Sequence, residues 1–187
     1  CWGDNFRGQL GIGTTAQANA PTWVVGLGEG VASLAAGVDH TCAVMKDRTA
    51  RCWGSNDFGQ LGTGTTTSST TPVGVVELSD VTAISAGYVV TCASTTDAAV
   101  RCWGDSSTVP VGDGSAELND EDVDGLLEPS TTPRDVAIRA GVGAIDAGSL
   151  QTCALRDSGA TSCWGRNPPG RLGDGTTTDS PVPVAVT

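Results

Sequence analysis

The sequence predicts an all-β fold, in which four-stranded antiparallel sheets recur along the chain as the blades of a β-propeller. The tripeptide Cys-Trp-Gly occurs four times, beginning at Cys1, Cys52, Cys102 and Cys163, with spacings of 51, 50 and 61 residues. A second tripeptide, Thr-Cys-Ala, begins at residues 41, 91 and 152. Self-similarity with a period of about 50 residues is typical of solenoids and propellers. The 187 residues therefore hold about three and a half copies of one unit.

Each unit has room for four short strands. In the second unit, β-branched and alternating segments predict strands over residues 72–76, 81–86, 89–94 and 99–103, the last of which closes the sheet. Gly-, Thr- and Ser-rich sequence separates these segments and favours tight turns. We expect a single propeller region, with repeats over residues 1–51, 52–101 and 102–162 and a partial repeat over 163–187.

The third repeat carries an insertion. Pro72 and Pro133 are 61 residues apart, whereas Gly64 and Gly114 keep the spacing of 50 residues. The 11 extra residues therefore fall near residues 115–131. An insertion confined to one stretch of a regular repeat indicates a surface loop.

The insertion contains a candidate calcium site. Asp120, Asp122 and Asp124 occupy positions 1, 3 and 5 of a loop, and Gly follows at position 6. This is the first half of a calcium-binding loop, in which carboxylates ligate the ion and Gly allows a sharp turn. The Glu usual at position 12 is absent, and Glu128 is the carboxylate that could replace it. The alternative is an acidic loop that is simply solvated.

Six of the seven cysteines form three pairs with identical spacing. Cys42 and Cys52, Cys92 and Cys102, and Cys153 and Cys163 are each ten residues apart and bracket a polar, turn-like stretch. Residues placed symmetrically about a hairpin turn lie opposite each other, at a separation close to that of a disulfide. The pattern predicts three cross-strand disulfides and an oxidising compartment. A zinc site would show closer Cys-x₂₋₄-Cys spacings, which the chain lacks.

Cys1 is the odd cysteine. By the same spacing rule, its partner would lie ten residues upstream of the first residue. This predicts either that the natural protein extends further or that Cys1 pairs between molecules.

The remaining composition disfavours several function classes. The formal charge of −11 argues against binding to nucleic acid or to anionic membranes. No stretch of about 18 apolar residues suggests a membrane span. The chain has one His and no Ser or Cys in a recognisable nucleophile context, so we expect no enzyme activity. Trp2, Trp53, Trp103 and Trp164 hold equivalent positions, where we expect them to pack between blades.

The sequence around Ala36–Gly62 resembles a known repeat. Ala-Gly-x-x-His-Thr-Cys-Ala, followed by Arg-Cys-Trp-Gly-x-Asn-x-x-Gly-Gln-Leu-Gly, is similar to the RCC1 repeat (regulator of chromosome condensation), in its cysteine-containing, bacterial secreted variety. The resemblance implies a seven-bladed propeller, of which this chain would form about half. Members of the family include a nucleotide exchange factor on chromatin and a secreted inhibitor of β-lactamases. The family His is present as His40 but is replaced by Val90 and Gln151, which suggests a structural role.

Two functions are compatible with these sequence features. The first is a non-enzymatic extracellular or cell-surface propeller that serves as a structural or protein-binding scaffold, with a protein partner or self-association completing it, as in a surface assembly or fibre. The second is a secreted inhibitor or regulator that docks one propeller face onto an enzyme. The second predicts aromatic anchors on the loops of one face. The candidates for these anchors are Phe6, Trp23, Phe58 and Tyr88.

Overall fold

The computed structural model describes residues 1–106, 111–114, 128–138 and 141–187. Within these residues, twelve strands form three four-stranded antiparallel sheets. The first sheet contains β1 (Val31–Ala36), β2 (His40–Met45), β3 (Ala50–Gly54) and β4 (Ser69–Gly74). The second contains β5 (Val81–Ala86), β6 (Val90–Thr95), β7 (Val100–Gly104) and β8 (Ser130–Asp135). The third contains β9 (Val142–Ala147), β10 (Gln151–Arg156), β11 (Thr161–Gly165) and β12 (Ser180–Ala185). The predicted all-β architecture with four strands per blade is confirmed.

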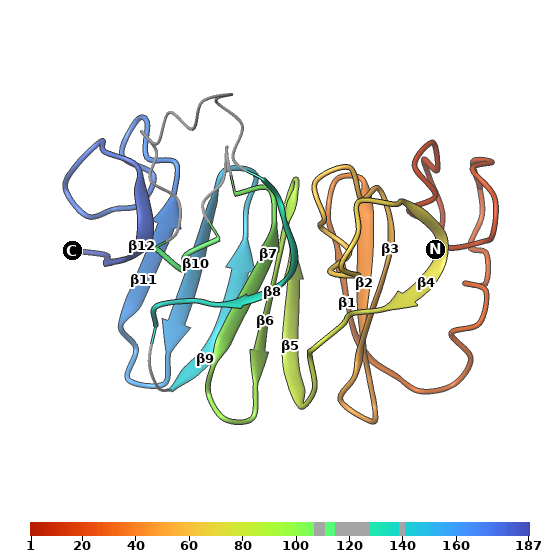
Figure 1. The fold of residues 1–187 in the computed structure, drawn as a ribbon, viewed down its shortest axis with the longest axis horizontal. Coiled ribbons are helices and arrows are strands. Elements are labelled where there is room, and N and C mark those ends of the chain that lie inside the picture. Colours follow the sequence, from red (N-terminus) through yellow and green to blue (C-terminus); the bar gives the residue numbers. More distant parts are fainter. Residues whose placement is uncertain (107–110, 115–127, 139–140) are drawn as a thin grey trace.

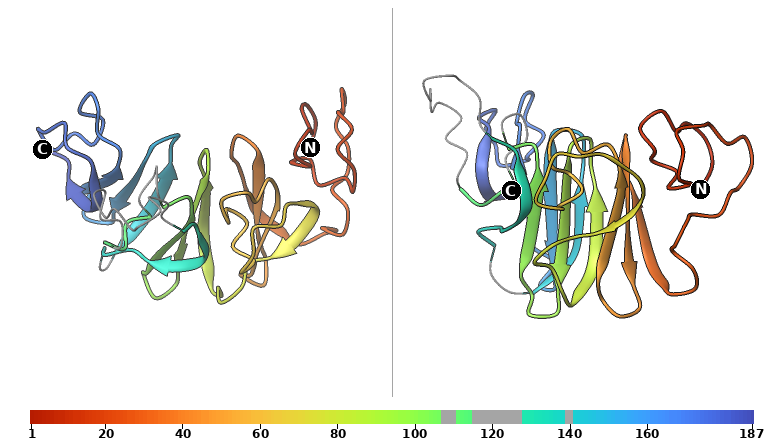
Figure 2. Two further views of the ribbon diagram at one scale, coloured as in Figure 1. Left: turned by 45° about the horizontal axis from the view of Figure 1, so that its top comes forward. Right: turned by 45° about the vertical axis from the view of Figure 1, so that its right-hand side comes forward.

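The three sheets stand side by side in chain order, as Figure 1 shows. Each sheet is a simple meander in which every strand pairs with its neighbours in sequence. β1 and β2 contact β5, and β5 and β6 contact β9, so successive blades meet through their first two strands. The fourth strands lie at the opposite edge of each sheet, and the blades spread like a fan in the views of Figure 2. No helix among the described residues is long and apolar enough to cross a membrane.

The boundaries between sheets differ from those expected for the second repeat. The strand predicted over residues 72–76 was expected to share a sheet with the hairpin that ends at residue 103. Its first three residues, 72–74, lie instead at the end of β4, which pairs with β3 of the preceding hairpin, with Cys52 opposite Val73. The loop over residues 55–68 returns the chain to the free edge of β3, and the next blade begins only at β5. The repeat period predicts the number of strands in each unit, but it does not predict which strand is the last of each sheet.

Residues 1–25 repeat the outer half of a blade. Gly3 forms a bridge with Ala18, as Gly54 pairs with Ser69 in the first sheet. Cys1 and Thr22 exchange two backbone hydrogen bonds, 2.8 and 2.9 Å long, in the place of the pairing between Cys52 and Val73. This N-terminal half-blade therefore packs before the first complete sheet.

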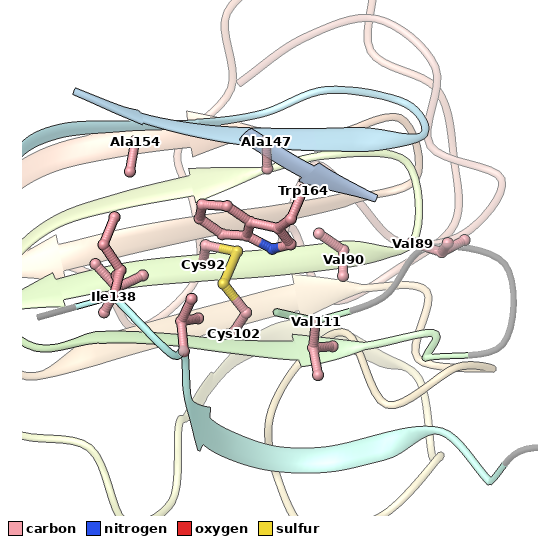
Figure 3. Close-up of a cluster of buried hydrophobic side chains, with 11 residues drawn as sticks. Val89, Val90, Cys92, Cys102, Val111, Ile138, Ala147, Ala154 and Trp164 are labelled. Carbon is pink, nitrogen blue, oxygen red and sulfur yellow. A yellow bond between two sulfur atoms is a disulfide. The ribbon is translucent and has the colours of Figure 1, made fainter. Parts of the chain in front are cut away.

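The hydrophobic core lies between the blades. Trp53, Trp103 and Trp164 are completely buried. Trp164 of the third blade packs in one cluster with Cys92 and Cys102 of the second blade, as Figure 3 shows. Trp103 packs in the same way with the cysteines of the first blade.

Trp2 departs from the expectation that all four tryptophans are packed between blades. Its side chain is 66% exposed. It belongs to the N-terminal half-blade, and among the described residues neither an inner hairpin of that half-blade nor a preceding blade is present to cover the indole.

Candidate functional site

The loops after the third strands hold neighbouring blades together through main-chain carbonyl groups. Trp53 Nε1 donates a 2.9 Å hydrogen bond to the Gln9 carbonyl oxygen, and Trp103 Nε1 donates a 2.9 Å bond to that of Gln60. The same two oxygens accept 2.8 Å bonds from the hydroxyl groups of Thr41 and Thr91. Because a carbonyl oxygen has two lone pairs, each loop satisfies two buried donors of the following blade.

The equivalent contact between the second and third blades is only partly described. Trp164 Nε1 and Thr152 Oγ1 are buried, and neither has a hydrogen-bond partner in the part of the chain that the structure describes. Pro110 stands at the position of Gln9 and Gln60, and it lies outside the described residues.

Gly62 gives Trp103 the space for this contact. A Cβ atom at Gly62 would lie 2.7 Å from Trp103 Nε1, and the φ of Gly62 is +67°. A Cβ atom at Gly11 would lie 2.7 Å from Trp53 Nε1, and one at Gly112 would lie 2.6 Å from Trp164 Nε1. The recurring Gly-x-Gly segments thus serve turn geometry and close packing between blades.

A buried asparagine holds three of the four equivalent loops in shape, whereas Ser106 stands at this position in the loop after β7. The amide nitrogen of Asn56 donates to the carbonyl oxygens of Thr65 and Thr67 at 2.8 and 3.0 Å, while its Oδ1 accepts a 2.8 Å bond from the backbone of Leu61. Asn5 and Asn167 make equivalent bonds in their own loops. These asparagines were not among the residues predicted from the sequence. Their recurrence four residues after the Cys of Cys-Trp-Gly was the available signal.

His40 has a structural place between the first two blades. Its Nε2 lies 2.8 Å from Thr91 Oγ1. Because the Thr91 hydroxyl donates its hydrogen to Gln60, Nε2 must donate to Thr91, and Nδ1 carries no proton. Nδ1 has no partner among the described residues, and burial lowers the pKa of His40 to about 4. His40 is therefore neutral and unsuited to acid–base catalysis near neutral pH.

The three cysteine pairs face each other across β2–β3, β6–β7 and β10–β11. In each pair the Cα atoms are 4.1 Å apart, and the two sulfur atoms lie at the bonding distance of 2.08–2.13 Å. Cys1 has no cysteine partner among the described residues. Whether the pairs are oxidised in the protein's own compartment stays a prediction.

The calcium hypothesis falls mostly outside the described residues. Asp120, Asp122 and Asp124 are not among them. Glu128 is described and exposed, and its backbone carbonyl accepts a 2.8 Å bond from Ser106 Oγ. No group of His, Cys, Asp and Glu that could hold a metal ion is found in the described ranges. Calcium binding stays a prediction.

Exposed aromatic residues gather on one end of the sheets. We call this end the loop face; it carries the β1–β2 and β3–β4 connections and their equivalents in the other blades. Phe6, Phe58 and Tyr88 lie in such connections and are 73%, 42% and 47% exposed. Trp23 is also exposed, but it corresponds to Gly74 at the end of β4 and so belongs to the opposite end.

Two further features belong to the loop face. Arg7 of the N-terminal loop and Asp57 of the β3–β4 loop form a 3.3 Å ion pair. A depression of about 350 Å³ is lined by Tyr88, Leu150, Arg166, Pro168 and Arg171, between the second and third blades. Large aromatic side chains and arginines are the residues that most often anchor protein–protein contacts. The loop face therefore has the chemistry of a protein-docking surface.

The fold and these surfaces define a partial β-propeller whose blades are joined by Trp–carbonyl contacts. Two family models, both described as "Regulator of chromosome condensation (RCC1) repeat", match the chain. One matches residues 31–60, and the other matches residues 1–44 and 52–94, so that together they cover residues 1–94 of 187. The chain belongs to the RCC1 repeat family.

Two curated relatives illustrate the similarity. Protein RCC2 homolog of Danio rerio is 45% identical over 69 residues, which are 36% of this chain and 14% of the relative. Ultraviolet-B receptor UVR8 of Arabidopsis thaliana is 31% identical over 188 aligned positions, covering 100% of this chain and 41% of the receptor. The chain thus spans less than half the length of these relatives.

A solved structure supports the fold. Yeast RCC1 (Prp20), solved bound to Kap60, matches the whole chain with a TM-score of 0.81 and 24% identity, and the match covers 44% of that protein. At this identity the likeness establishes the propeller fold alone.

Proposed function

We propose that this chain is a non-enzymatic scaffold that binds a partner protein through its loop face. The observation that carries the proposal is the placement of Phe6, Phe58 and Tyr88 at one end of the sheets. The loops that present them are held by buried asparagines and by Trp–carbonyl bonds, so little conformational entropy is lost on docking. Yeast RCC1, a member of the same fold, has been solved with a protein partner, which supports a binding role for this architecture.

A matched set of variants tests this surface. Phe6→Ala, Phe58→Ala and Tyr88→Ala combined should abolish recovery of the partner by cross-linking and affinity purification from the source cells. Trp23→Ala removes an exposed aromatic at the opposite end and should leave recovery unchanged. Equal losses in both variants, or loss in neither, would exclude the loop face as the docking surface.

The compartment is proposed to be extracellular or at the cell surface. The support is the three cysteine pairs at bonding distance, since disulfides persist in oxidising surroundings and are rare in the cytosol. The test is alkylation of the protein in intact source cells before and after reduction, followed by mass spectrometry. Six cysteines should react only after reduction, and ready alkylation of all of them would place the protein in a reducing compartment.

The partner could be an enzyme that the propeller inhibits or another subunit of a surface assembly. The aromatic anchors favour the inhibitor alternative, because a protein inhibitor presents such anchors on one face. Exposed Leu155 and Val186 on the third blade favour assembly, because exposed apolar side chains promote association. Light scattering of the purified chain separates the two: a concentration-independent monomer would exclude self-assembly.

A further inference from the structure

The depression between the second and third blades on the loop face carries two arginines, in a chain whose formal net charge is −11. Arg166 and Arg171 line it together with Tyr88, Leu150 and Pro168, and its volume is about 350 Å³. None of these described lining residues is Asp or Glu. We call this site the arginine depression, because it concentrates positive charge on an acidic protein.

The internal repeats show that blade architecture does not require Arg166. The residue directly follows Cys-Trp-Gly, and the same position holds Asp4 in the half-blade, Ser55 in the first blade and Asp105 in the second. Arg166 Nη1 lies 3.3 Å from Asp179 Oδ2, and 43% of the arginine side chain is exposed. The ion pair therefore holds the guanidinium group in place while leaving it accessible from solvent.

A coupled change explains why an arginine is tolerated at position 171. The equivalent residue in the first blade is Gln60, whose Oε1 accepts a 2.9 Å hydrogen bond from the backbone N–H of Phe58. Pro169 stands at the position of Phe58 and has no N–H, so this loop needs no acceptor side chain. Arg171 donates instead to the carbonyl oxygen of Pro168. The charge of Arg171 therefore replaces a neutral side chain without loss of loop structure.

An apolar wall adjoins the two guanidinium groups. Leu150 packs against the core cluster that contains Trp164, which fixes its position, and Tyr88 is 47% exposed. A carboxylate accepts short, charge-assisted bonds from arginine, often two in parallel. A tyrosine ring beside an aliphatic side chain can cover an apolar side chain of a ligand. The arginine depression therefore matches a short segment in which a carboxylate side chain lies next to an apolar one.

We propose that the arginine depression binds an acidic segment of the partner protein. A Glu or Asp side chain of the partner meets Arg166 and Arg171, and its apolar neighbour packs on Tyr88. The net charge of the chain does not prevent this contact, because salt screens charges beyond about 8 Å at physiological ionic strength and the arginines act at close range. This inference rests on the proposed function of the loop face and adds the chemistry of the partner.

The test uses the single tyrosine of the chain as a reporter. Tyr88 is that residue, so labelling with fluorotyrosine gives one fluorine NMR resonance at the arginine depression. The labelled chain is titrated with the capped peptide acetyl-Gly-Glu-Phe-Glu-Gly-amide and with the same peptide carrying Gln in place of both Glu residues. The Glu peptide should shift the resonance saturably and bind at least about tenfold more tightly than the Gln peptide, because its bonds to arginine are charge-assisted.

Two sets of variants separate this site from the rest of the loop face. Arg166→Ser combined with Arg171→Gln introduces the residues of the first blade and should reduce the affinity for the Glu peptide to that for the Gln peptide. Arg7→Gln removes an exposed arginine from the N-terminal loop and should leave the affinity unchanged. Circular dichroism checks that the variants are folded. In the wild-type chain, higher ionic strength should weaken binding of the Glu peptide, because salt screens exposed charges.

Equal affinities for the two peptides, or full affinity in the double arginine variant, would overturn the proposal. Tighter binding of inorganic phosphate than of the Glu peptide would also overturn it, because the site would then be specific for phosphate. The titration uses the purified chain without a partner, so its failure is distinguishable from failure of the proposed function. Loss of partner recovery in the aromatic loop-face variant would still support docking there if the peptide did not bind.

Discussion

The carbonyl oxygen of Gln60 shows how single atoms join two blades. It accepts bonds from Trp103 and Thr91, and Thr91 in turn accepts one from His40, so four residues form a continuous polar chain across the interface. A buried acceptor that satisfies two donors avoids the cost of about 1–3 kcal/mol for each donor left unpaired. The side chain of Gln60 has no part in these bonds. Gln60 and the equivalent Gln9 therefore act through their main-chain carbonyl groups.

Gly62 is predicted to be far less tolerant of substitution than Gly64. Both have a positive φ, +67° and +78°, but a Cβ at Gly62 would overlap Trp103, whereas one at Gly64 would meet nothing within 4 Å. Gly64→Ala should cost about 1 kcal/mol of unfolding free energy for backbone strain. Gly62→Ala should cost about 3 kcal/mol, because overpacking adds to the strain. Urea denaturation measures both, and equal costs would contradict the proposed role of the indole contact.

His40 is predicted to make the stability depend on pH. Burial lowers its pKa to about 4 in the folded protein, against about 6.5 in the unfolded chain, so the unfolded state binds the proton more readily. The contribution of His40 is therefore complete above pH 6.5 and is lost as the pH falls from 6.5 to about 4. The loss should total about 3 kcal/mol.

His40→Val provides the control for this prediction, because Val90 stands at the equivalent position of the second blade. Urea denaturation of both proteins between pH 4 and pH 7.5 isolates the histidine from the acidic groups that they share. The difference in unfolding free energy should change across this interval, and a constant difference would show that His40 does not titrate as argued.

At the scale of elements, the hairpins were the most predictable feature. Cys42 and Cys52 are symmetric about a polar turn, and the same register recurs at Cys92 and Cys102. The fourth strand was not predictable in the same way. Which hairpin β4 joins depends on the path of the loop over residues 55–68, and a repeat period is equally compatible with any starting point.

The candidate site was predictable only in part. Phe58 and Tyr88 follow predicted strand ends, so alternation of strand direction places them on one face, whereas Trp23 follows a segment that the sequence did not identify as a strand. The acceptors of the Trp–carbonyl bonds gave no sequence signal, because every residue has a main-chain carbonyl group. The sequence therefore identifies donor side chains such as Trp103, whereas their main-chain acceptors can be identified only from the fold.

The cysteine pairs are predicted to stabilise their hairpins. Closing a loop of ten residues with a disulfide should contribute about 2–3 kcal/mol. The double variant Cys92→Ala with Cys102→Ala should therefore lower the urea midpoint, whereas Cys1→Ala should leave it unchanged because Cys1 has no partner among the described residues. Identical midpoints for oxidised and reduced wild-type protein would show that the pairs do not act as cross-links.

At the scale of the whole molecule, the main strand contacts between blades in the described part of the chain join successive blades. The clusters around Trp53, Trp103 and Trp164 contain different residues and lie in successive interfaces. In such an array, stability is approximately a sum of blade terms and nearest-neighbour interface terms. A substitution in one interface should therefore destabilise mainly the two blades that share it. A substitution in the single core of a globular domain would instead destabilise the whole domain.

Leu61 and Leu172 provide a matched test of this locality. Both are completely buried at equivalent positions, and the backbone of each donates to the loop asparagine, Asn56 or Asn167. Leu61→Ala should cost about 2–5 kcal/mol at the interface with Trp103. Hydrogen exchange should then show lower protection in β2 and β6, with β10 unchanged, because local openings report local stability. Leu172→Ala should reverse this pattern, lowering protection in the third blade and sparing the first. Equal loss of protection across all three sheets in both variants would mean that the array unfolds as one cooperative unit.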